Sequence, residues 1–392
     1  YKRQVGRQWV AHNAVFDLGW LQEHGIYPEG DVRCTMLASR VLTNGLKNVK
    51  HGLQHVVSRY LKEEISKEEQ KSDWSGQLSD GQLQYAVKDV DVLLRLLPLL
   101  KHRLADGCLM GAWLLECKAL PAMAQLWRTG LPFSEEALLQ LQKDLAADHK
   151  KLGDEFIVML DEALPEQMKL PRDADGTINL RPKASGSIRA GTKLEAGFNL
   201  NSPKQLLSVF TALLGEVPKD VNGKDSASKE ALKEYVGDSP VVAKYLQWKR
   251  VEKRRQMAES LIKHQDVDGY VRASYMQMGA DTGRMSCMSP NLQQVPREQR
   301  FRACVQVRRG WKFVVADFAQ EELRLAAAES GDDRMIEAFQ QGMDLHTLTA
   351  MSIYGVEQDA VTKEQRQVAK SANFGLLFGS GAKGLRNYAA TT

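Results

Sequence analysis

The stretch Phe313-Val314-Val315-Ala316-Asp317-Phe318-Ala319-Gln320-Glu321-Glu322-Leu323-Arg324 decides the fold of this chain. Its first four residues are apolar, β-branched or small, which predicts a buried strand. An amphipathic helix is expected to begin a few residues later. A carboxylate at the end of a buried strand has a fixed direction and faces solvent, so Asp317 is a candidate ligand for a divalent metal ion. An aspartate that only caps the following helix fits the same letters equally well.

A second stretch, later in the chain, shifts this balance. Arg366, Lys370 and Phe374 stand at every fourth position of a predicted helix that begins at Thr362, where a Gln three residues on completes a capping box. On a helix this spacing places the three side chains along one face. Two cations and one ring in line can hold a polyphosphate and stack a base. A solvated basic face is the alternative, but it rarely places a Phe in line with Arg and Lys.

Two shorter patterns lie near the N-terminus. Residues 8–11 read as a short strand, and Asn13 and Asp17 follow it four positions apart. Tyr85 and Asp89 repeat that spacing inside an apolar-periodic helix. An Asp on each of two helices, with a phenol one turn from the second, could hold a metal ion and orient a water for phosphodiester hydrolysis. Two ordinary helix faces are the favoured interpretation on spacing alone, because such short spacings often arise by chance.

Composition sets wide bounds on function. The 392 residues are 43% hydrophobic and 26% charged with a net charge of +4, which is ordinary for two or three globular domains. The mild basic excess permits nucleic-acid binding without arguing for it. Five scattered cysteines without a CxxC pair argue against a disulfide framework or a zinc site. No apolar run approaches the ~20 residues that cross a membrane, so no membrane partner is expected.

Four separated motifs resemble those of family A DNA polymerases, the bacterial polymerase I type. The resemblance implies a bacterial or phage source for this chain. Asp317-Phe-Ala-Gln-Glu-Glu322-Leu-Arg324 resembles their motif A, and Arg366-x-x-x-Lys370-x-x-x-Phe374-Gly375 resembles motif B on the fingers helix. Two further stretches resemble the palm segment of these polymerases that contacts the primer-template. They are Thr282-Gly283-Arg284 and Pro290-Asn291-Leu292-Gln293.

The N-terminal patterns resemble a second family. Asn13-x-x-x-Asp17 and Tyr85-x-x-x-Asp89 are similar to the second and third motifs of the DEDD proofreading exonucleases, tyrosine subtype. The first motif, Asp-x-Glu, is not found before Asn13, and the polymerase motif C, His-Asp-Glu, is not found after Gly379. The chain also starts at Tyr1 without Met. We therefore expect a fragment truncated at both ends with incomplete active sites. Such a fragment is expected to bind DNA but to extend primers poorly.

The resemblance implies an α/β fold, α+β overall. We expect an RNase H-like exonuclease domain, N-terminally truncated, and then part of a right-hand polymerase domain. The expected parts are the exonuclease domain at 1–105, a connecting helix at 106–133, the thumb at 134–265, and a partial palm and fingers at 266–392. Cap residues predict helices that begin after Ser134, Ser202 and Ser239. Residues 165–197 read as a basic loop.

The helix after Ser239 carries many cations with Tyr245 and Trp248 between them. Basic residues with interleaved rings suit a nucleic-acid backbone. A solvated helix with its rings in the core fits the sequence about equally well. Given the resemblance to a thumb, we favour DNA contact by Lys249, Arg250, Lys253 and Arg254.

The implied function is addition of deoxynucleotides to a primer 3′-end by two-metal nucleotidyl transfer, with an associated 3′–5′ proofreading exonuclease. The implied cofactor is Mg²⁺, two ions per site, with Mn²⁺ as a substitute. The implied partners are primer-template DNA and deoxynucleoside triphosphates; nothing points to a processivity partner. The implied location is the cytoplasm of a bacterium or of a phage-infected host, with an organellar origin as the open alternative.

The resemblance also implies a role for each site residue. Asp317, Lys370 and Tyr85 are the expected catalytic residues. Metal ligands are expected at Asp317, Asp17 and Asp89. The nucleotide is expected to meet Glu322 (as a gate against the 2′-hydroxyl), His346, Arg366, Lys370, Phe374 and Phe378. The minor groove and template are expected to meet Arg284, Asn291 and Gln293. Phe378 stands where many relatives have Tyr, which we expect to tune fidelity.

Two other interpretations remain open. One is an RNase D-like exonuclease with a degenerate polymerase body, because the segment from Glu68 to Trp74 is similar to a stretch in those nucleases. The other is a non-catalytic fragment that binds primer-template DNA.

Overall fold

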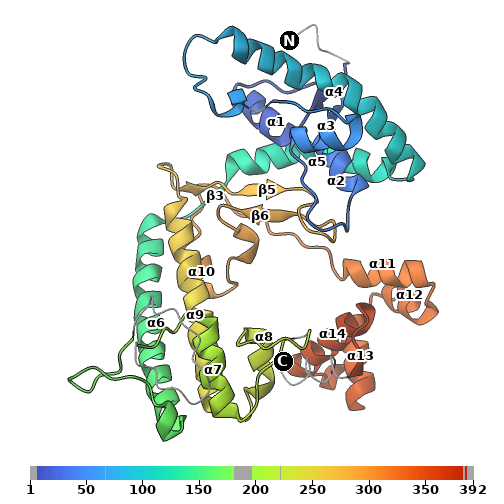
Figure 1. Ribbon diagram of the computed structural model, residues 1–392. Coiled ribbons are helices and arrows are strands. Elements are labelled where there is room, and N and C mark those ends of the chain that lie inside the picture. Colours follow the sequence, from blue (N-terminus) through green and yellow to red (C-terminus); the bar gives the residue numbers. More distant parts are fainter. Residues whose placement is uncertain (1–6, 67, 181–196, 221, 383–384, 386–392) are drawn as a thin grey trace. The chain divides into compact units, whose positions relative to one another are not determined.

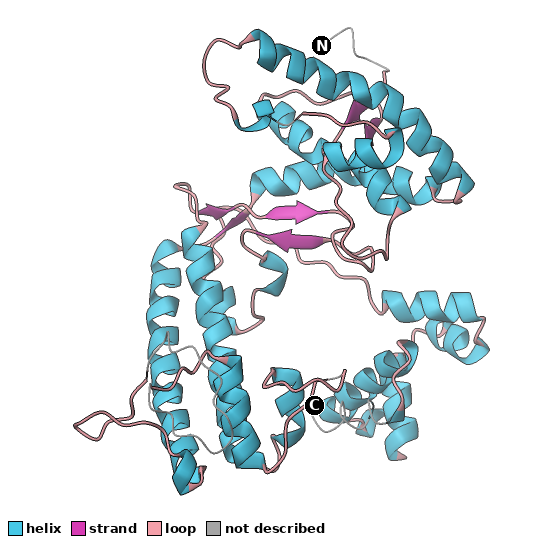
Figure 2. Ribbon diagram, viewed as in Figure 1, coloured by secondary structure: helices cyan, strands magenta, loops and turns pink. Residues whose placement is uncertain are grey.

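The computed structural model describes residues 7–66, 68–180, 197–220, 222–382 and 385. It forms two compact units, one built from residues 1–163 and 243–309 and the other from residues 164–242 and 310–392 (Figure 1). Each unit therefore joins segments that are far apart in sequence. Helices dominate both units, and the named strands form three two-stranded pairs (Figure 2). The domain boundaries at 105, 133 and 265 stay predictions.

The first unit opens with a parallel strand pair covered by helices. β1 (Trp9–Ala11) pairs with β2 (Val32–Cys34) in the register Trp9↔Val32. Five helices complete this part: α1 (Ala14–Glu23), α2 (Thr35–Leu42), α3 (Leu53–Leu61), α4 (Asp80–Asp106) and α5 (Met110–Thr129), with a short 3-10 turn at Glu68–Lys71. The crossover through α1 is what a parallel pair requires. One apolar core, which includes Leu18, Val56, Leu96 and Trp113, holds the strands and helices together.

Helix α4 shows how local sequence sets an element. Ser79 accepts from the backbone N–H of Gln82, and the Gln82 side chain accepts from the backbone N–H of Ser79, a complete capping box. Val92, Leu93, Leu96 and Leu100 recur at helical spacing and are buried. The helix ends at Asp106, before Gly107.

The rest of the first unit is a helical pair with small strand pairs. The long helices α6 (Glu135–Ala163) and α9 (Pro240–Lys263) lie side by side (Figure 1). The smaller elements are β3 (Leu131–Pro132), β4 (Tyr270–Val271), β5 (Ser274–Met276), β6 (Ser286–Met288), a 3-10 turn at Leu292–Gln294 and α10 (Gln299–Arg302). β3 pairs with β4 and β5 with β6, both antiparallel. Phe133, Leu138, Leu261 and Phe301 are buried in a shared core.

The second unit is helical. Its helices are α7 (Pro203–Leu214), α8 (Lys229–Leu232), α11 (Glu321–Ser330), α12 (Asp333–Gln340), α13 (Leu345–Tyr354) and α14 (Lys363–Leu377), with 3-10 turns at Glu166–Met168, Lys233–Tyr235 and Gln358–Ala360. Leu323, Ala338 and Leu345 form a small core that joins α11, α12 and α13. Among the described residues, none of the helices is both long and apolar enough to cross a membrane.

The helix starts expected from the sequence are confirmed. Ser202 accepts from the N–H of Gln205, with Pro203 at the first helical position. Thr362 and Gln365 form the predicted capping box of α14. α6 begins one residue after Ser134, and α9 begins at Pro240. Of the loop expected at 165–197, residues 181–196 lie outside the described part of the chain.

The strand predicted at residues 313–316 is wrong. This segment has no regular secondary structure, and Val314 and Val315 are 91% and 90% exposed. A strand is held by ladder hydrogen bonds to a neighbour, and no named strand among the described residues pairs with this segment. The helix expected after it does form, as α11.

Candidate nucleotide and nucleic-acid sites

Two of the three side chains predicted on one face of α14, Lys370 and Phe374, share a surface, and Phe378 joins them there. Lys370, Phe374 and Phe378 line a cavity of about 230 Å³, together with Gln367, Ser371, Gly375 and Ser380. The rings of Phe374 and Phe378 are nearly parallel, 8° apart with centroids separated by 6.3 Å. The cavity therefore combines an ammonium group with flat apolar surface, which suits a phosphorylated ligand that carries a base.

Arg366 lies one turn before Lys370 and is held by an aspartate that sequence reasoning missed. Its Nε and Nη2 donate to the two carboxylate oxygens of Asp344 at 2.7 and 3.1 Å. Asp344 also caps α13 by accepting from the N–H of Thr347. Burial opposes the charge on Asp344, but hydrogen bonds from Arg366 and Thr347 outweigh it and lower its pKa to about 2. Asp344 therefore fixes the guanidinium while leaving it 44% exposed.

His346, an expected nucleotide contact, is buried in the structure. It is 3% exposed, its Nδ1 lies 3.1 Å from the amide nitrogen of Asn373, and its ring packs 5.7 Å from Phe374. Burial lowers its pKa, so the imidazole is neutral near pH 7. In this arrangement His346 supports the Phe374 ring and offers no positive charge to a phosphate.

Asp317 and Glu322 stand before and within the first turn of α11. Asp317 lies in the irregular segment and is exposed, whereas Glu322 is partly buried. Asp317 and α14 both belong to the second compact unit. That the expected metal ligand faces the expected phosphate-binding residues across a nucleotide-sized gap stays a prediction.

The expected DNA contacts of the palm lie on and after the β5–β6 hairpin. Arg284 is exposed in the turn between these strands, where the N–H of Ala280 donates to its carbonyl oxygen at 3.1 Å. Asn291 accepts from the backbone N–H of Gln293 and so begins the 3-10 turn that displays the exposed Gln293 side chain. All three side chains belong to the first unit.

The interleaved rings of α9 are core residues, which corrects their interpretation as a nucleic-acid surface. Tyr245 and Trp248 are 4% and 3% exposed and pack against Phe156 of α6. Helix α9 turns its aromatic face to α6 because those rings are its largest apolar side chains.

The cations of α9 also divide into two groups. Arg254 is ion-paired with Glu298, and the half-buried Lys249 lies 5.0 Å from the centre of the Trp248 ring. Arg250 and Lys253 are exposed. Of the four expected DNA contacts on this helix, those two are the ones whose charges face solvent.

The expected exonuclease residues lie on α1 and α4. Asn13 precedes α1 in a left-handed conformation with φ of 68°, and Asp17 follows within the first turn. Desolvation raises the pKa of the Asp17 carboxyl, although the side chain is exposed. Burial and the charge of the hydrogen-bonded Asp89 raise the pKa of Tyr85, so this phenol is protonated at neutral pH.

A polar network that sequence reasoning missed supports the Asn13 turn. The ring of His12 lies 2.9 Å from the hydroxyl of Thr35 and 2.9 Å from the carbonyl oxygen of His51. Ser39 connects the ring of His51 to the guanidinium of Arg59. Burial, with the nearby charges of Arg40 and Arg59, lowers the pKa of His51 to about 4. In the sequence, the only sign of this network is that polar residues such as His12 follow the strand predicted at residues 8–11.

The metal sites implied by the sequence are not complete within the described residues. No group of three or more His, Cys, Asp or Glu side chains there is arranged to hold a metal ion. The roles of Asp317, Asp17 and Asp89 as ligands of a divalent cation stay predictions.

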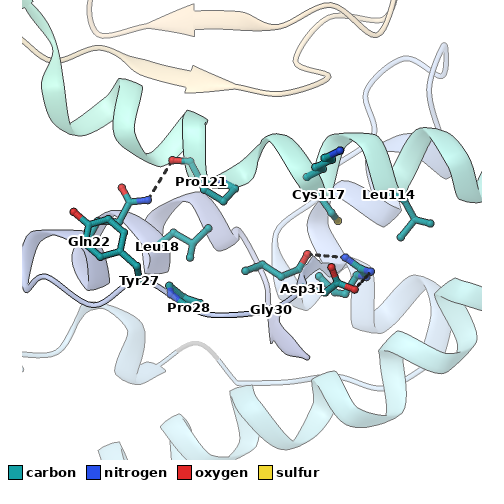
Figure 3. Close-up of a pocket in the computed structure, with 12 residues that line it drawn as sticks. Leu18, Gln22, Tyr27, Pro28, Gly30, Asp31, Leu114, Cys117 and Pro121 are labelled. Carbon is teal, nitrogen blue, oxygen red and sulfur yellow. Dashed lines mark hydrogen bonds and ion pairs between the residues drawn. The ribbon is translucent and has the colours of Figure 1, made fainter. Parts of the chain in front are cut away.

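A separate pocket lies between α1, the loop before β2, and α5 (Figure 3). Its volume is about 370 Å³, and its lining includes Leu18, Gln22, Asp31, Arg33 and Cys117. Arg33 is paired with Asp31 at 2.6 Å, and Gln22 donates to the carbonyl oxygen of Pro121. None of the expected exonuclease residues lines this pocket.

Comparison with known proteins defines the class of this chain. Residues 4–105 match the family model of a 3′–5′ exonuclease, and residues 184–392 match that of DNA polymerase family A. The molecule is thus an exonuclease domain followed by part of a polymerase domain. The chain belongs to DNA polymerase family A, which confirms the resemblance seen in its motifs.

Individual relatives agree with this assignment. The chain is 33% identical to DNA polymerase I of Aquifex aeolicus (strain VF5), over 97% of this chain and 62% of that protein. It is 30% identical to DNA polymerase I of Chloroflexus aurantiacus, over 96% of this chain and 38% of that protein. A similar fold is found in a solved structure, the POL domain of Pol1 from M. smegmatis in complex with DNA primer-template and dNTP. It has a TM-score of 0.72 and 24% identity, over 96% of this chain and 59% of that one.

Proposed function

We propose that this chain is part of a DNA polymerase that adds deoxynucleotides to a primer 3′-end, and that its exonuclease domain removes nucleotides from such an end. The chain spans 62% of the length of its Aquifex relative, so the activity is proposed for the protein to which these residues contribute. One observation carries the proposal: Lys370, Phe374 and Phe378 line one cavity on α14, beside the anchored guanidinium of Arg366.

Each side chain of the α14 site has a role in this proposal. Lys370 provides a point charge for the triphosphate, and Arg366 provides a planar donor that Asp344 holds in direction. Phe374 offers a ring face to the base, and Phe378 extends that face. Glu322 is the proposed gate against a 2′-hydroxyl, and Arg284, Asn291 and Gln293 are the proposed contacts to primer-template DNA.

The proposed cofactor is Mg²⁺, with two ions in each active site. Both matched families depend on divalent metal ions. Asp317 is the proposed ligand of this chain for polymerisation, and Asp17 and Asp89 are those for hydrolysis. When bound, the ions would supply charge that lowers the barrier at the reacting phosphate. The proposed location is the cytoplasm of a bacterium or of a phage-infected host, because the relatives named above are bacterial proteins.

Nucleotide binding tests the polymerase proposal. The chain, bound to fluorescent primer-template DNA with Mg²⁺, is titrated with the complementary deoxynucleoside triphosphate. We expect Lys370→Ala to weaken binding about tenfold, the effect of losing ~1.4 kcal/mol of interaction. Arg334→Ala, which removes an exposed cation on α12 of the same unit, is the matched control. Equal affinities of wild type and Lys370→Ala would refute the assignment of this site.

Hydrolysis of single-stranded DNA tests the exonuclease part. In the protein to which these residues contribute, we expect the Mg²⁺-dependent release of 3′-nucleotides to fall strongly in Asp17→Ala. Tyr85→Phe keeps the ring and removes the hydroxyl that is hydrogen-bonded to Asp89, and we expect it to slow hydrolysis while leaving DNA affinity unchanged. If hydrolysis is equally fast in Asp17→Ala, the residues of α1 do not form this active site.

A further inference from the structure

The β5–β6 hairpin is tied to the exonuclease domain by an arginine on α2. Arg40 donates from Nη1 to the carbonyl oxygen of Met278 at 3.1 Å and from Nη2 to the sulfur of Met276 at 2.8 Å. These partners are 238 and 236 positions away along the chain. All of these residues belong to the first compact unit. The fork of one guanidinium therefore holds the end of β5 and the start of its turn.

Two further contacts anchor the same segment. The side chain of Met278 packs against the apolar core of the exonuclease domain. Gln277 is 5% exposed, and its amide donates to the carbonyl oxygen and to the carboxylate of Glu116 on α5, at 2.8 and 2.7 Å. The hairpin is thus held from two helices, by α2 on one side and by α5 on another.

The loop after α2 reaches the tip of the hairpin. A methyl group added at Gly283 would lie 3.5 Å from the amide nitrogen of Asn44, an ordinary contact distance. Gly283 has φ of +81°, a conformation that glycine adopts without strain. Its N–H donates to the carbonyl oxygen of Ala280 at 2.9 Å, which closes the turn that carries Arg284.

The hairpin needs such support because its own ladder is short. β5 and β6 share three residue pairs, from Ser274↔Met288 to Met276↔Ser286. An isolated two-stranded hairpin is at best marginally stable in water. The direction of its turn therefore depends on the surfaces that hold it, which here belong to α2, α5 and the loop at Asn44.

We propose that the exonuclease domain positions the Thr282–Arg284 turn, with Arg40 as the positioning residue, and so sets the affinity of the polymerase part for primer-template DNA. This inference rests on the proposed function, which assigns the turn to DNA. The inference adds that the polymerase part depends on the exonuclease domain for its structure. Loss of the Arg40 side chain on α2 would loosen the Thr282–Arg284 turn, which is the proposed DNA contact of the palm.

A direct contact of Arg40 with a phosphate is the competing explanation. Both terminal nitrogens of Arg40 are already engaged with the hairpin, and its side chain is partly buried. These two bonds direct the guanidinium toward the hairpin, and a phosphate could accept only from its remaining N–H groups. The two explanations differ without DNA present, because only a positioning role changes the hairpin of the free protein.

Hydrogen exchange on the free chain, followed by DNA titration, tests the proposal. In Arg40→Met we expect amides of residues 277–285 to exchange about tenfold faster, which corresponds to ~1.4 kcal/mol of lost local stability. Amides of α4 are expected to keep their rates. The affinity for primer-template DNA should fall about tenfold, and that for single-stranded DNA should stay unchanged.

Two variants serve as controls. Arg95→Met removes an exposed arginine of α4 that pairs with Glu63, and we expect no change in residues 277–285. Arg40→Lys keeps the charge but not the fork, so we expect intermediate exchange and affinity. Full recovery of DNA affinity in Arg40→Lys, with hairpin exchange as fast as in Arg40→Met, would overturn the proposal in favour of a direct charge effect.

The outcomes separate this inference from the proposed function. Unchanged exchange at 277–285 in Arg40→Met overturns the positioning role, whatever happens to DNA. If wild type fails to bind primer-template DNA, the proposed function fails, while faster exchange at the hairpin still supports the anchoring by Arg40. If Arg40→Met unfolds as a whole, the result for Arg40→Lys decides between the explanations. Faster exchange confined to the hairpin in Arg40→Lys supports the positioning role, and unchanged exchange there overturns it.

Discussion

Asp344 shows how one side chain can serve an element and a site together. It caps α13 through the N–H of Thr347 and fixes Arg366 on α14 with two hydrogen bonds. A substitution with Asn keeps a good cap and removes the charge, whereas Ala removes both. The two substitutions therefore separate the structural role from the electrostatic one.

We expect Asp344→Asn to cost about 0.5–1 kcal/mol of unfolding free energy, because the Arg366 side chain is 44% exposed and water screens the pair. Asp344→Ala should cost about 1 kcal/mol more, through the lost cap. Both should weaken nucleotide binding if the pair orients Arg366. Urea unfolding and nucleotide titration check these values, and equal stability of the two variants would contradict the separation.

The same pair predicts a dependence on pH. The pKa of Asp344 falls from its ordinary value of 3.8 to about 2 on folding, so the unfolded chain takes up a proton first as the pH drops. Its stabilisation is present above pH 4 and is lost as the pH falls toward 2. The difference in unfolding free energy between wild type and Asp344→Asn should therefore shrink in that window.

His51 also predicts that the protein loses stability as the pH falls, but over a higher pH range than Asp344. Its pKa is 6.5 in the unfolded chain and about 4 in the folded one, so only the unfolded state gains a proton between these values. The stability of the exonuclease domain should fall from pH 6.5 to pH 4. Thermal unfolding of wild type and His51→Gln across this range checks it, and a slope that is equally steep in both would exclude His51 as the cause.

Among whole elements, helix boundaries could be predicted best from the sequence. Ser202, Thr362 and Pro240 mark helix starts with signals that act within four residues, so no distant part of the chain is needed. The shared surface of Lys370 and Phe374 followed from the same local periodicity, whereas Phe378 was expected only from the resemblance to the family. The Arg366–Asp344 pair and the burial of His346 could not be predicted, because they depend on how α13 packs against α14.

Helix α9 gives a test at the scale of one element. We expect Arg250→Gln and Lys253→Gln each to reduce the salt dependence of DNA binding by about one unit of slope and to change stability by less than about 0.5 kcal/mol. Lys244→Gln is the matched control, because Lys244 is paired with Glu155 at 2.8 Å. If Lys244→Gln reduces the salt dependence of DNA affinity more than Arg250→Gln and Lys253→Gln do, the DNA lies along another face of α9.

For the molecule as a whole, the limit of prediction lies in pairings between distant segments. The apolar letters of residues 313–316 predict a strand, but a strand forms only beside a partner, and the sequence does not name one. The anchoring of the β5–β6 hairpin by Arg40 was likewise invisible, because 238 residues separate Arg40 from Met278. Motifs identified the chemistry, and only the structure showed which side chains meet.

The unpaired segment has a consequence for the behaviour of the chain in solution. Val314 and Val315 are almost fully exposed and β-branched, next to the half-exposed Phe313. An apolar extended segment with free backbone groups can pair with another copy of itself. We therefore expect concentration-dependent association of this chain, and we expect Val315→Lys to reduce it.

The same substitution tests whether the segment is packed. Because Val315 is 90% exposed, Val315→Lys should change the free energy of unfolding by less than about 0.5 kcal/mol. Val271→Lys, at a fully buried position of β4, should instead destabilise the protein by several kcal/mol. Sedimentation velocity over a range of concentrations and urea unfolding measure the two effects. If Val315→Lys is as destabilising as Val271→Lys, residues 313–316 are packed in solution, and the strand predicted from their letters is formed there after all.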